Sequence, residues 1–488
     1  MVVNGARLTI KEATVDKTGE VSQAKQNAPN DDSGKYCRVV PVAKFHKKIR
    51  AKPDDVRETG DRDELLPGPE DYDLIIVGAG PSGLFCAINS MQNGKKIVIL
   101  ERKNSPGHKL LISGFGRCNI THDGDIQDFL DHYGDHGRFL RPALLGFTNR
   151  DLISFFKDLG LGMVQERGGN IFPDTMQARD VLDILTLQRQ ELGVVIKCSQ
   201  AVTSITRRGD SFFLGCVGGS YRSKLLVIAT GGCSYPATGS SGDGYRFAGI
   251  LGHSISEIGP ALTPIFIKDY PFSELAGLSF SDMKISLYRH AKIKEYRGDI
   301  LFTHDGLSGP GILDLSRYIR AEDVIKLSFV PEDRREALEE WLVERARRDG
   351  GRSLRSVLGS LPNLVPPGVP LSPRLTKRLL EISGIASDLQ TAQLTRKMRN
   401  RLIDNLTGLP LVVSDVCGFD LAMCTRGGVE TAEVDPKTMQ SRLVKGLYLV
   451  GEVLDVDGDT GGYNLQAAFS TGMLAARSIK NDFDRISG

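Results

Sequence analysis

The sequence predicts an α/β protein in which one Rossmann-like nucleotide-binding domain is interrupted by a β-barrel-like insert and a small helical insert. Three observations predict this class. An apolar run at residues 74–77 leads directly into Gly78-x-Gly80-x-x-Gly83 and an apolar helical stretch. Short β segments and then helices follow from about residue 255. A strand, a glycine-rich turn and a long apolar helix then return after residue 446. At 488 residues the chain is long enough for two or three domains.

The first stretch has the spacing of a dinucleotide-binding unit. In such a unit Gly78 makes the tight turn, Gly80 lets the backbone approach a pyrophosphate, and Gly83 lets the helix pack closely on the strand. A second apolar run at residues 97–100 ends in Glu101, which is placed to bind ribose hydroxyls. The phosphates would lie at a helix N-terminus, where unpaired N–H groups favour negative charge. Glycine-rich turns are common, but the flanking strands and the acid in register favour a nucleotide site.

Composition excludes several classes of protein. Apolar residues make up 40% of the chain and charged residues 25%, as in ordinary globular proteins. No apolar run is long enough for a membrane span, and the first residues lack an apolar signal core, so we expect a cytoplasmic protein. The eight cysteines include no CxxC pair and lie mostly in apolar segments, as Cys86, Cys198 and Cys216 do. We therefore expect reduced thiols and no metal site. The net charge of +2 selects no class of partner.

Residues 1–70 are polar and mixed in charge, with the basic island KFHKKIRAK. This composition predicts a largely disordered extension. The basic island can contact nucleic acid, although a solvated tail is the favoured interpretation.

The loop HKLLISGFGRCN follows the nucleotide unit and is expected beyond the carboxyl ends of the strands, where open α/β sheets bind ligands. Lys109 and Arg117 can neutralise pyrophosphate charge, and Asn119 can bond a flavin edge or a substrate carbonyl. Cys118 is either a buried small hydrophobe or a thiol that faces a redox centre.

Residues 139–193 have apolar positions at helical spacing and predict helices that cover one face of the sheet. Short strands are predicted at residues 194–196, 201–205, 212–217 and 225–229. The last of them runs into Thr230-Gly231-Gly232, a turn that either lets backbone lie against a cofactor or simply ends the strand. The first part of the nucleotide-binding domain therefore spans residues 71–254.

Short β segments at residues 263–267, 283–288, 299–303 and 324–329 predict a small barrel or sandwich, in two parts at 255–330 and 408–435. A helical insert is predicted between them, at 331–407. It is locally basic through Arg345, Arg347, Arg348, Arg352, Arg355, Arg374, Lys377, Arg378, Arg396, Lys397, Arg399 and Arg401. A solvated helical surface and a phosphate-binding surface explain these cations equally well.

Residues 436–488 form the predicted C-terminal part of the nucleotide-binding domain. A strand ends in Gly451-Glu452, and the turn VLDVDGDTGG opens a long helix. In a two-dinucleotide flavoprotein this arrangement places an acid on the ribitol hydroxyls and a helix N-terminus beside the flavin N1/O2 edge. The alternative is an acidic calcium loop, but the segment lacks the bidentate Glu of that motif, so no metal is expected.

Five ordered blocks together resemble the BaiN/RdsA flavoprotein family, also described as YhiN-like or aminoacetone-oxidase-like. The blocks are VGAGPSGL; HKLLISGFGRCNIT; TGGCSYPATGSSGDGY with GHSI and PALTPI; LFTHDGLSGPGILDLS; and GGVETAEVDPKTM with GLYLVGEVLDVDGDTGGYNLQAAFSTG. The resemblance covers about residues 73–479. It implies an FAD-binding domain with a barrel-like insert that itself carries a helical insert. It also implies a reductase, fed by NADH or NADPH, of carbon–carbon double bonds conjugated to a carbonyl.

Family members act on steroid-like enones or on a uridine of 23S ribosomal RNA, which becomes dihydrouridine. The resemblance therefore implies ribosomal RNA as a partner through the basic insert. Alternatives are a small-molecule enone reductase or amine oxidase, and a protein that holds FAD without catalysis. No second GxGxxG unit is visible, so the nicotinamide reductant is expected to bind transiently over the flavin.

Reduction of such a bond needs a hydride at the β-carbon and an acid that protonates the α-carbon. Cys118 is the first candidate for the acid, followed by His304 and Tyr463. The residues expected to bind FAD are Gly78, Gly80, Gly83, Glu101, Arg102, Lys109, Arg117, Asn119, Val202, Gly231, Gly451, Glu452, Gly461, Gly462, Asn464 and Leu465.

Overall fold

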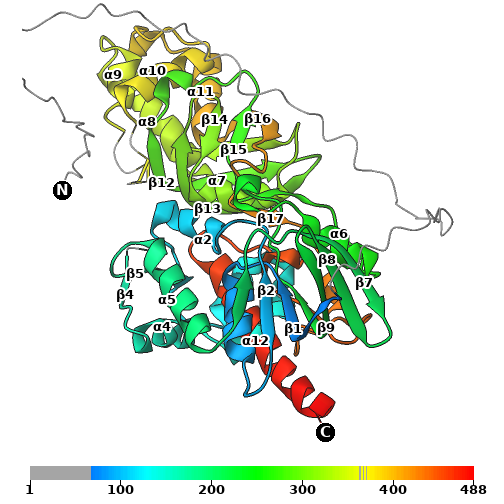
Figure 1. Ribbon diagram of the computed structural model, residues 1–488. Coiled ribbons are helices and arrows are strands. Elements are labelled where there is room, and N and C mark those ends of the chain that lie inside the picture. Colours follow the sequence, from blue (N-terminus) through cyan, green and yellow to red (C-terminus); the bar gives the residue numbers. More distant parts are fainter. Residues whose placement is uncertain (1–67, 167, 362–363, 367, 370, 488) are drawn as a thin grey trace, which may run out of the picture. The chain divides into compact units, whose positions relative to one another are not determined.

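The computed structural model describes residues 68–487 apart from 167, 362, 363, 367 and 370 (Figure 1). These residues belong to one compact unit, Pro67–Gly488. A disordered extension is predicted for residues 1–70, and residues 1–67 of it lie outside the described residues. Strand β1 (Glu70–Val77) begins three residues after that point.

A central sheet joins the two ends of the described chain. Its parallel strands are β6 (Val195–Lys197), β2 (Ile97–Leu100), β1, β9 (Gly219–Ile228) and β18 (Leu447–Leu449), in that order. β1 ends in four buried residues and β2 is buried throughout, as expected for parallel strands covered on both faces. β18 comes from the C-terminal segment, so the last strand of the nucleotide-binding sheet is supplied by residues that follow both inserts in the sequence.

One edge of β9 is shared between two partners. β8 (Ser211–Cys216) pairs antiparallel with the first half of β9, and β18 pairs parallel with the second half. β7 (Val202–Arg208) extends the antiparallel side. Helices α1 (Pro81–Ser90) and α12 (Tyr463–Ser487) pack against each other. A Cβ at Gly472 of α12 would lie 2.8 Å from the Ser82 carbonyl oxygen, so glycine permits this close approach.

Five further helices belong to this part of the chain: α2 (His108–Ile112), α3 (Gly137–Gly146), α4 (Asn149–Asp158), α5 (Ala178–Glu191) and α6 (Asp243–Ile250). The expectation that residues 139–193 are helical is wrong between α4 and α5. There β4 (Met163–Gln165) and β5 (Asn170–Pro173) form a hairpin, and β3 (Thr121–His122) pairs with β5. Gly168 and Gly169 both have positive φ angles, which allow the tight turn between the two strands.

Six strands form a closed antiparallel barrel in the order β11-β14-β13-β12-β15-β16. Their bounds are β11 (Ile265–Ile267), β12 (Ser279–Tyr288), β13 (Lys292–Phe302), β14 (Gly306–Ser308), β15 (Val324–Ser328) and β16 (Leu409–Val416). Buried aromatic side chains, among them Phe280, Phe302 and Phe329, fill it. A two-stranded sheet of β10 (Gly259–Ala261) and β17 (Cys424–Arg426) lies outside the barrel strands.

The helices between β15 and β16 are α8 (Arg335–Arg348), α9 (Leu354–Leu358), α10 (Pro373–Ile382) and α11 (Arg396–Gly408). Their buried leucines belong to the same hydrophobic cluster as the barrel strands. α9, α10 and α11 begin after Ser353, Ser372 and Thr395, whose side chains accept N-cap hydrogen bonds. The predicted fold class is therefore confirmed. Among the described helices, none combines the length and apolar character needed to cross a bilayer.

Candidate functional site

A cavity of about 1030 Å³ connects the nucleotide-binding sheet with the barrel side of the molecule. Its walls include the turn after β1, the starts of α1 and α12, the loop after β2, and barrel residues such as Tyr296 and Asp314. All of the residues predicted for the site line this cavity except Gly83, Cys118 and His304. The chain therefore brings together segments that are nearly 400 residues apart in sequence.

The glycine turn at the start of α1 has the steric requirements that its spacing predicts. A Cβ at Gly78 would lie 2.5 Å from the Ala229 carbonyl oxygen, and a Cβ at Gly83 would lie 2.1 Å from the Gly78 carbonyl oxygen. Gly83 thus serves helix packing and does not line the cavity. At Gly80 a Cβ would meet nothing within 4 Å, so the backbone is open on the cavity side. Gly80 also provides no side-chain cap for α1, which leaves N–H groups for a phosphate.

Glu101 is oriented by two backbone hydrogen bonds. The Ala79 N–H donates to its Oε2 at 2.9 Å and the Lys103 N–H donates to its Oε1 at 2.8 Å. Each carboxylate oxygen keeps a further lone pair, so Glu101 can still accept from ribose hydroxyls in the cavity.

The basic residues predicted to bind FAD, of which Lys109 and Arg117 are expected at the pyrophosphate, all have carboxylate partners. Lys109 Nζ donates to Glu452 Oε2 at 2.6 Å, and the other oxygen of Glu452 accepts from the Thr425 N–H and the Ser234 hydroxyl. Lys109 and Glu452, for which the sequence predicts separate roles, therefore form one ion pair, because both face the same part of the cavity. The other cations are also paired: Arg102 with Asp243 at 2.8 Å, and Arg117 with Glu166 at 3.1 Å while it lies over the Phe172 ring.

The second glycine turn places the start of α12 at the cavity. Gly461 and Gly462 have φ angles of +118° and +98°, and a Cβ at Gly462 would lie 2.5 Å from the Thr121 backbone. The Asn464 amide closes the turn, because its Oδ1 accepts from the Gly458 N–H and its Nδ2 donates to the Gly458 carbonyl. The first N–H groups of α12 thus lie at the cavity, beside Leu465.

Asn119 provides a further test of whether a flavin fits. Its Nδ2 donates to Asn170 Oδ1 at 3.0 Å, whereas its Oδ1 is buried and has no hydrogen-bond partner among the described residues. A buried acceptor without a partner is costly unless a ligand supplies the donor. The open backbone at Gly80, the lone pairs of Glu101 and this Asn119 oxygen fit a dinucleotide that carries a hydrogen-bonding ring.

The geometry does not support two of the three predicted acids. Cys118 is fully buried in the hydrophobic core beside the cavity, and burial raises the pKa of its thiol to about 12. His304 lies exposed in the turn between β13 and β14 and does not line the cavity. Tyr463 does line it. The Tyr463 ring stacks between His132 and His122, with centroid distances of 4.0 and 5.2 Å, and burial raises the pKa of its hydroxyl.

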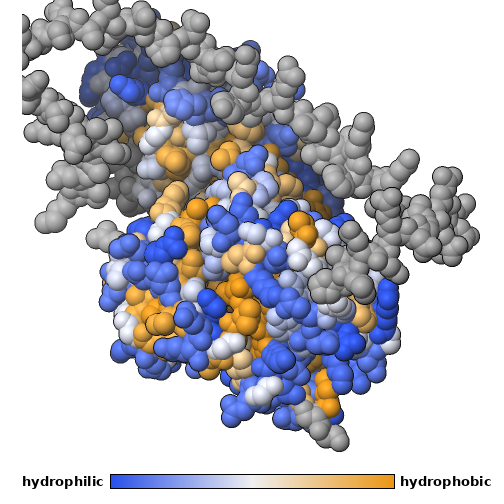
Figure 2. Space-filling view, viewed as in Figure 1, coloured by the Kyte–Doolittle hydropathy of each residue, from blue (hydrophilic) through white to orange (hydrophobic). Residues whose placement is uncertain are grey.

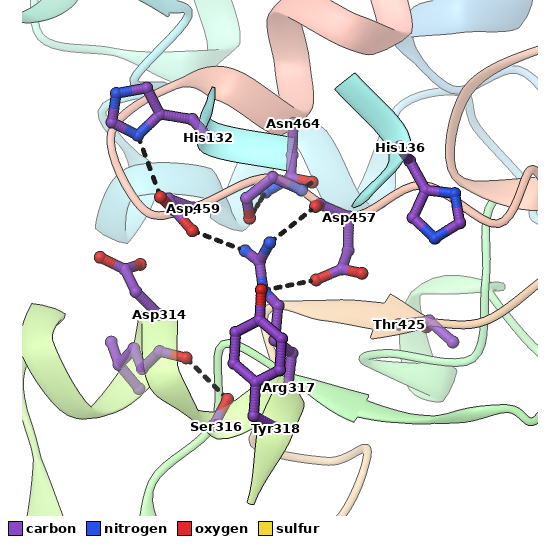
Figure 3. Close-up of polar contacts among 12 residues, drawn as sticks. His132, His136, Asp314, Ser316, Arg317, Tyr318, Thr425, Asp457, Asp459 and Asn464 are labelled. Carbon is purple, nitrogen blue, oxygen red and sulfur yellow. Dashed lines mark hydrogen bonds and ion pairs between the residues drawn. The ribbon is translucent and has the colours of Figure 1, made fainter. Parts of the chain in front are cut away.

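The acidic loop compared above with a calcium loop is bound by basic side chains (Figure 3). The Arg317 guanidinium, which follows α7 (Pro310–Leu315), lies between two of its carboxylates. Its Nη2 lies 2.7 Å from Asp459 Oδ1 and its Nε lies 3.0 Å from Asp457 Oδ2. The other oxygen of Asp459 lies 2.9 Å from His132 Nδ1. These contacts hold the loop before α12 against the barrel side.

Sequence reasoning missed Tyr296, Asp314, Arg317 and His132. Asp314 is the only one with a local signal, since a lone acid inside the apolar helical segment GILDL needs a buried partner. The others have contacts that depend on long-range packing.

The mouth of the cavity is partly apolar. Figure 2 shows apolar areas among hydrophilic ones over the nucleotide-binding part and near its junction with the barrel. The exposed apolar residues that line the cavity are Ile112, Phe115, Leu301, Leu421 and Met423. Phe115 is 89% exposed in a left-handed backbone conformation, so its ring is held out into solvent at the rim.

Comparison with known proteins agrees with this geometry. The family model described as HI0933-like protein Rossmann domain matches residues 72–478. A 3-dehydro-bile acid delta(4,6)-reductase of Clostridium scindens is 32% identical over 412 residues, which are 83% of this chain and 98% of that protein. A ribosomal RNA dihydrouridine synthase of Escherichia coli is 31% identical over 410 residues, or 84% and 98% of the two chains. The chain belongs to the HI0933-like family and is an FAD-dependent oxidoreductase.

Proposed function

We propose that the protein reduces a carbon–carbon double bond conjugated to a carbonyl, with NADH or NADPH as the electron source, and that its substrate is a uridine of large-subunit ribosomal RNA. The residues that would hold FAD are those of the two glycine turns, with Glu101 at the ribose and Asn119 at the flavin. When bound, the flavin supplies the two-electron chemistry. The chain's own residues would orient the base, exclude water and supply the proton for the α-carbon.

The observation that carries the RNA assignment is Phe115. An aromatic ring that is 89% exposed at a cavity mouth is suited to stacking on an unpaired base. A uridine inside an RNA must leave its stack before its ring can enter an enclosed site. Phe115 and the neighbouring Arg117 would receive the bases next to the one that is turned inward.

The helical insert supports the same assignment. Its ion pairs include Arg345–Asp349, Arg348–Glu344 and Arg399–Glu339, and other exposed cations have no carboxylate within 4 Å among the described residues. These are Arg347, Arg352, Arg355, Arg374, Arg396, Lys397 and Arg401. Unpaired cations on one compact lobe suit contacts with a phosphate backbone.

A small-molecule enone reductase is the second candidate. The exposed apolar rim residues Ile112, Leu301, Leu421 and Met423 favour it, because an apolar substrate gains from burying them. The relative that acts on bile acids is consistent with that chemistry. A small apolar substrate gains nothing from the cations of the helical insert.

Dihydrouridine in large-subunit ribosomal RNA from cells with and without the gene separates the two candidates. We expect one dihydrouridine to disappear when the gene is deleted and to return with the wild-type gene. An unchanged content of dihydrouridine at every position would contradict the RNA assignment.

A further inference from the structure

Asp314 is a buried carboxyl group on the barrel side of the large cavity. It belongs to α7, is 7% exposed and lines the cavity. Its Oδ1 accepts from the Thr460 N–H at 2.6 Å, and its Oδ2 accepts from the Tyr296 hydroxyl at 2.9 Å. Because Thr460 directly precedes the glycine turn that begins α12, Asp314 adjoins the part of the cavity expected to hold the flavin ring.

A second, smaller cavity of about 80 Å³ also contacts this carboxyl. Tyr296, Asp314 and Asp459 line both cavities and therefore form a partition between them. The other lining residues of the small cavity are Asp131, Gly134, Lys294, Leu315, Arg317 and Tyr318. A polar space of this size has room for water molecules, which would carry protons to the partition.

The charges around Asp314 favour its neutral form. The cation of Arg317 is already shared by Asp457 and Asp459, so Asp314 has a like charge nearby and, within the part of the chain that the structure describes, no ion pair of its own. The titratable or charged groups that line the two cavities around it include Asp131, His132, Lys294, Tyr296, Asp299, Arg317, Tyr318, Asp459 and Tyr463. Lys294 lies at the small cavity, where its Nζ donates to the Tyr318 hydroxyl at 3.0 Å.

Burial raises the pKa of Asp314 to about 6, and the neighbouring carboxylate of Asp459 acts in the same direction. The hydrogen bonds from Thr460 and Tyr296 oppose this shift because they stabilise the carboxylate. A carboxyl group that titrates near neutral pH can both donate a proton and regain it during turnover.

We propose that Asp314 is the acid that protonates the α-carbon of the substrate, and that it regains a proton from solvent through the small cavity. This assignment rests on the proposed function. It takes the place of Cys118, whose thiol lies outside the cavity.

In the proposed reaction, the π bond of the substrate breaks as the β-carbon gains a hydrogen with two electrons from the cofactor, which NADH or NADPH has reduced. The remaining electron pair forms a bond from the α-carbon to the proton of Asp314, and the O–H bond of Asp314 breaks. The resulting carboxylate keeps its hydrogen bonds from Tyr296 and Thr460. A proton from water in the small cavity then restores the acid.

Asp314→Asn tests the assignment, with Asp305→Asn, an exposed carboxyl of the barrel, as the matched control. The probe is an unmodified fragment of large-subunit ribosomal RNA transcribed in vitro. We expect the FAD content and the rate of flavin bleaching by NADPH to stay at wild-type values. Formation of dihydrouridine should fall about 100-fold or more, as for loss of a general acid. Full turnover by the FAD-loaded Asn variant would overturn the proposal.

Infrared spectroscopy provides a readout that does not depend on turnover. The carbonyl band of a protonated carboxyl should disappear with a midpoint near pH 6 in the wild type and be absent in Asp314→Asn. Tyr296→Phe removes a hydrogen bond that stabilises the carboxylate, so the midpoint should move to higher pH. The descending limb of kcat against pH should move with it, because the acid acts only when protonated.

An infrared midpoint or a kcat profile that does not move in Tyr296→Phe would overturn the proposal, even if Asp314→Asn fails to fold. A wild-type enzyme that reduces no uridine would instead contradict the proposed function, and the infrared titration of Asp314 would still be measurable.

Discussion

Replacement of Arg317 by Met should destabilise the protein strongly. Arg317 and Asp457 are 8% and 6% exposed. Arg317 donates to Asp459 Oδ1 at 2.7 Å and to the Asp457 carbonyl at 3.2 Å, and its Nε lies 3.0 Å from Asp457 Oδ2 as an ion pair without a hydrogen bond. The charge-assisted hydrogen bond to Asp459 contributes about 1.5–3 kcal/mol, and loss of the cation also leaves the buried Asp457 carboxylate uncompensated, so the total cost should be roughly the 3–5 kcal/mol of a broken buried ion pair. We expect a decrease of this size in the free energy of unfolding, measured in urea near pH 8 with saturating FAD.

The cost should depend on pH. Burial already raises the pKa of Asp457, and Arg317 opposes this shift, so its loss raises the pKa further. An acid with a raised pKa in the folded state loses stability as pH rises, so the cost should be smaller near pH 5 than near pH 8. Asp457→Asn in the Met variant should restore part of the loss. As a matched surface control, Arg222→Met breaks an exposed pair with Asp71 and should cost at most about 1 kcal/mol. A loss below about 1 kcal/mol for Arg317→Met, or an equal loss at both pH values, would refute this reasoning.

Four further substitutions test the site. Gly80→Ala should fold normally but bind FAD more weakly. Gly83→Ala should instead lower the melting temperature, because its Cβ would lie 2.1 Å from the Gly78 carbonyl oxygen. Fluorescence titration with FAD measures the first effect, and thermal unfolding measures the second. Phe115→Ala should leave stability within about 0.5 kcal/mol and weaken binding of a single-stranded RNA fragment about tenfold, while equal affinity in a filter-binding assay would contradict the stacking role. Cys118→Ala should keep turnover near the wild-type rate. A large loss of turnover in the FAD-loaded variant would instead support Cys118 as the proton donor.

The features predicted correctly from the sequence are those that local sterics and periodicity determine. The strand, the glycine turn at residues 78–83 and the helix after it follow from short-range geometry within one unit, whereas the role of Glu101 at a ribose stays a prediction. The barrel strands are visible as short apolar segments. The hairpin of β4 and β5 was missed because both strands are very short and lie between two strongly periodic helices.

The pairing of charges could not be predicted in the same way. Lys109 and Glu452 are separated by 343 positions, and Arg317 and Asp459 by 142. Their contacts exist because the barrel insert returns its chain to the nucleotide-binding sheet. The two candidates for the proton donor differ in the same way. Cys118 lies in the loop after β2 and is buried in the core, whereas Asp314 lines the cavity from the insert, and which of them donates the proton is what the proposed experiments test.

The most direct test of the proposed reaction uses purified, FAD-loaded protein, NADPH and unmodified large-subunit ribosomal RNA without oxygen. The account predicts that the flavin is bleached by NADPH, that the RNA restores its colour, and that mass spectrometry finds dihydrouridine at one position. Bleaching that the RNA does not reverse, together with RNA that contains only uridine, would contradict it.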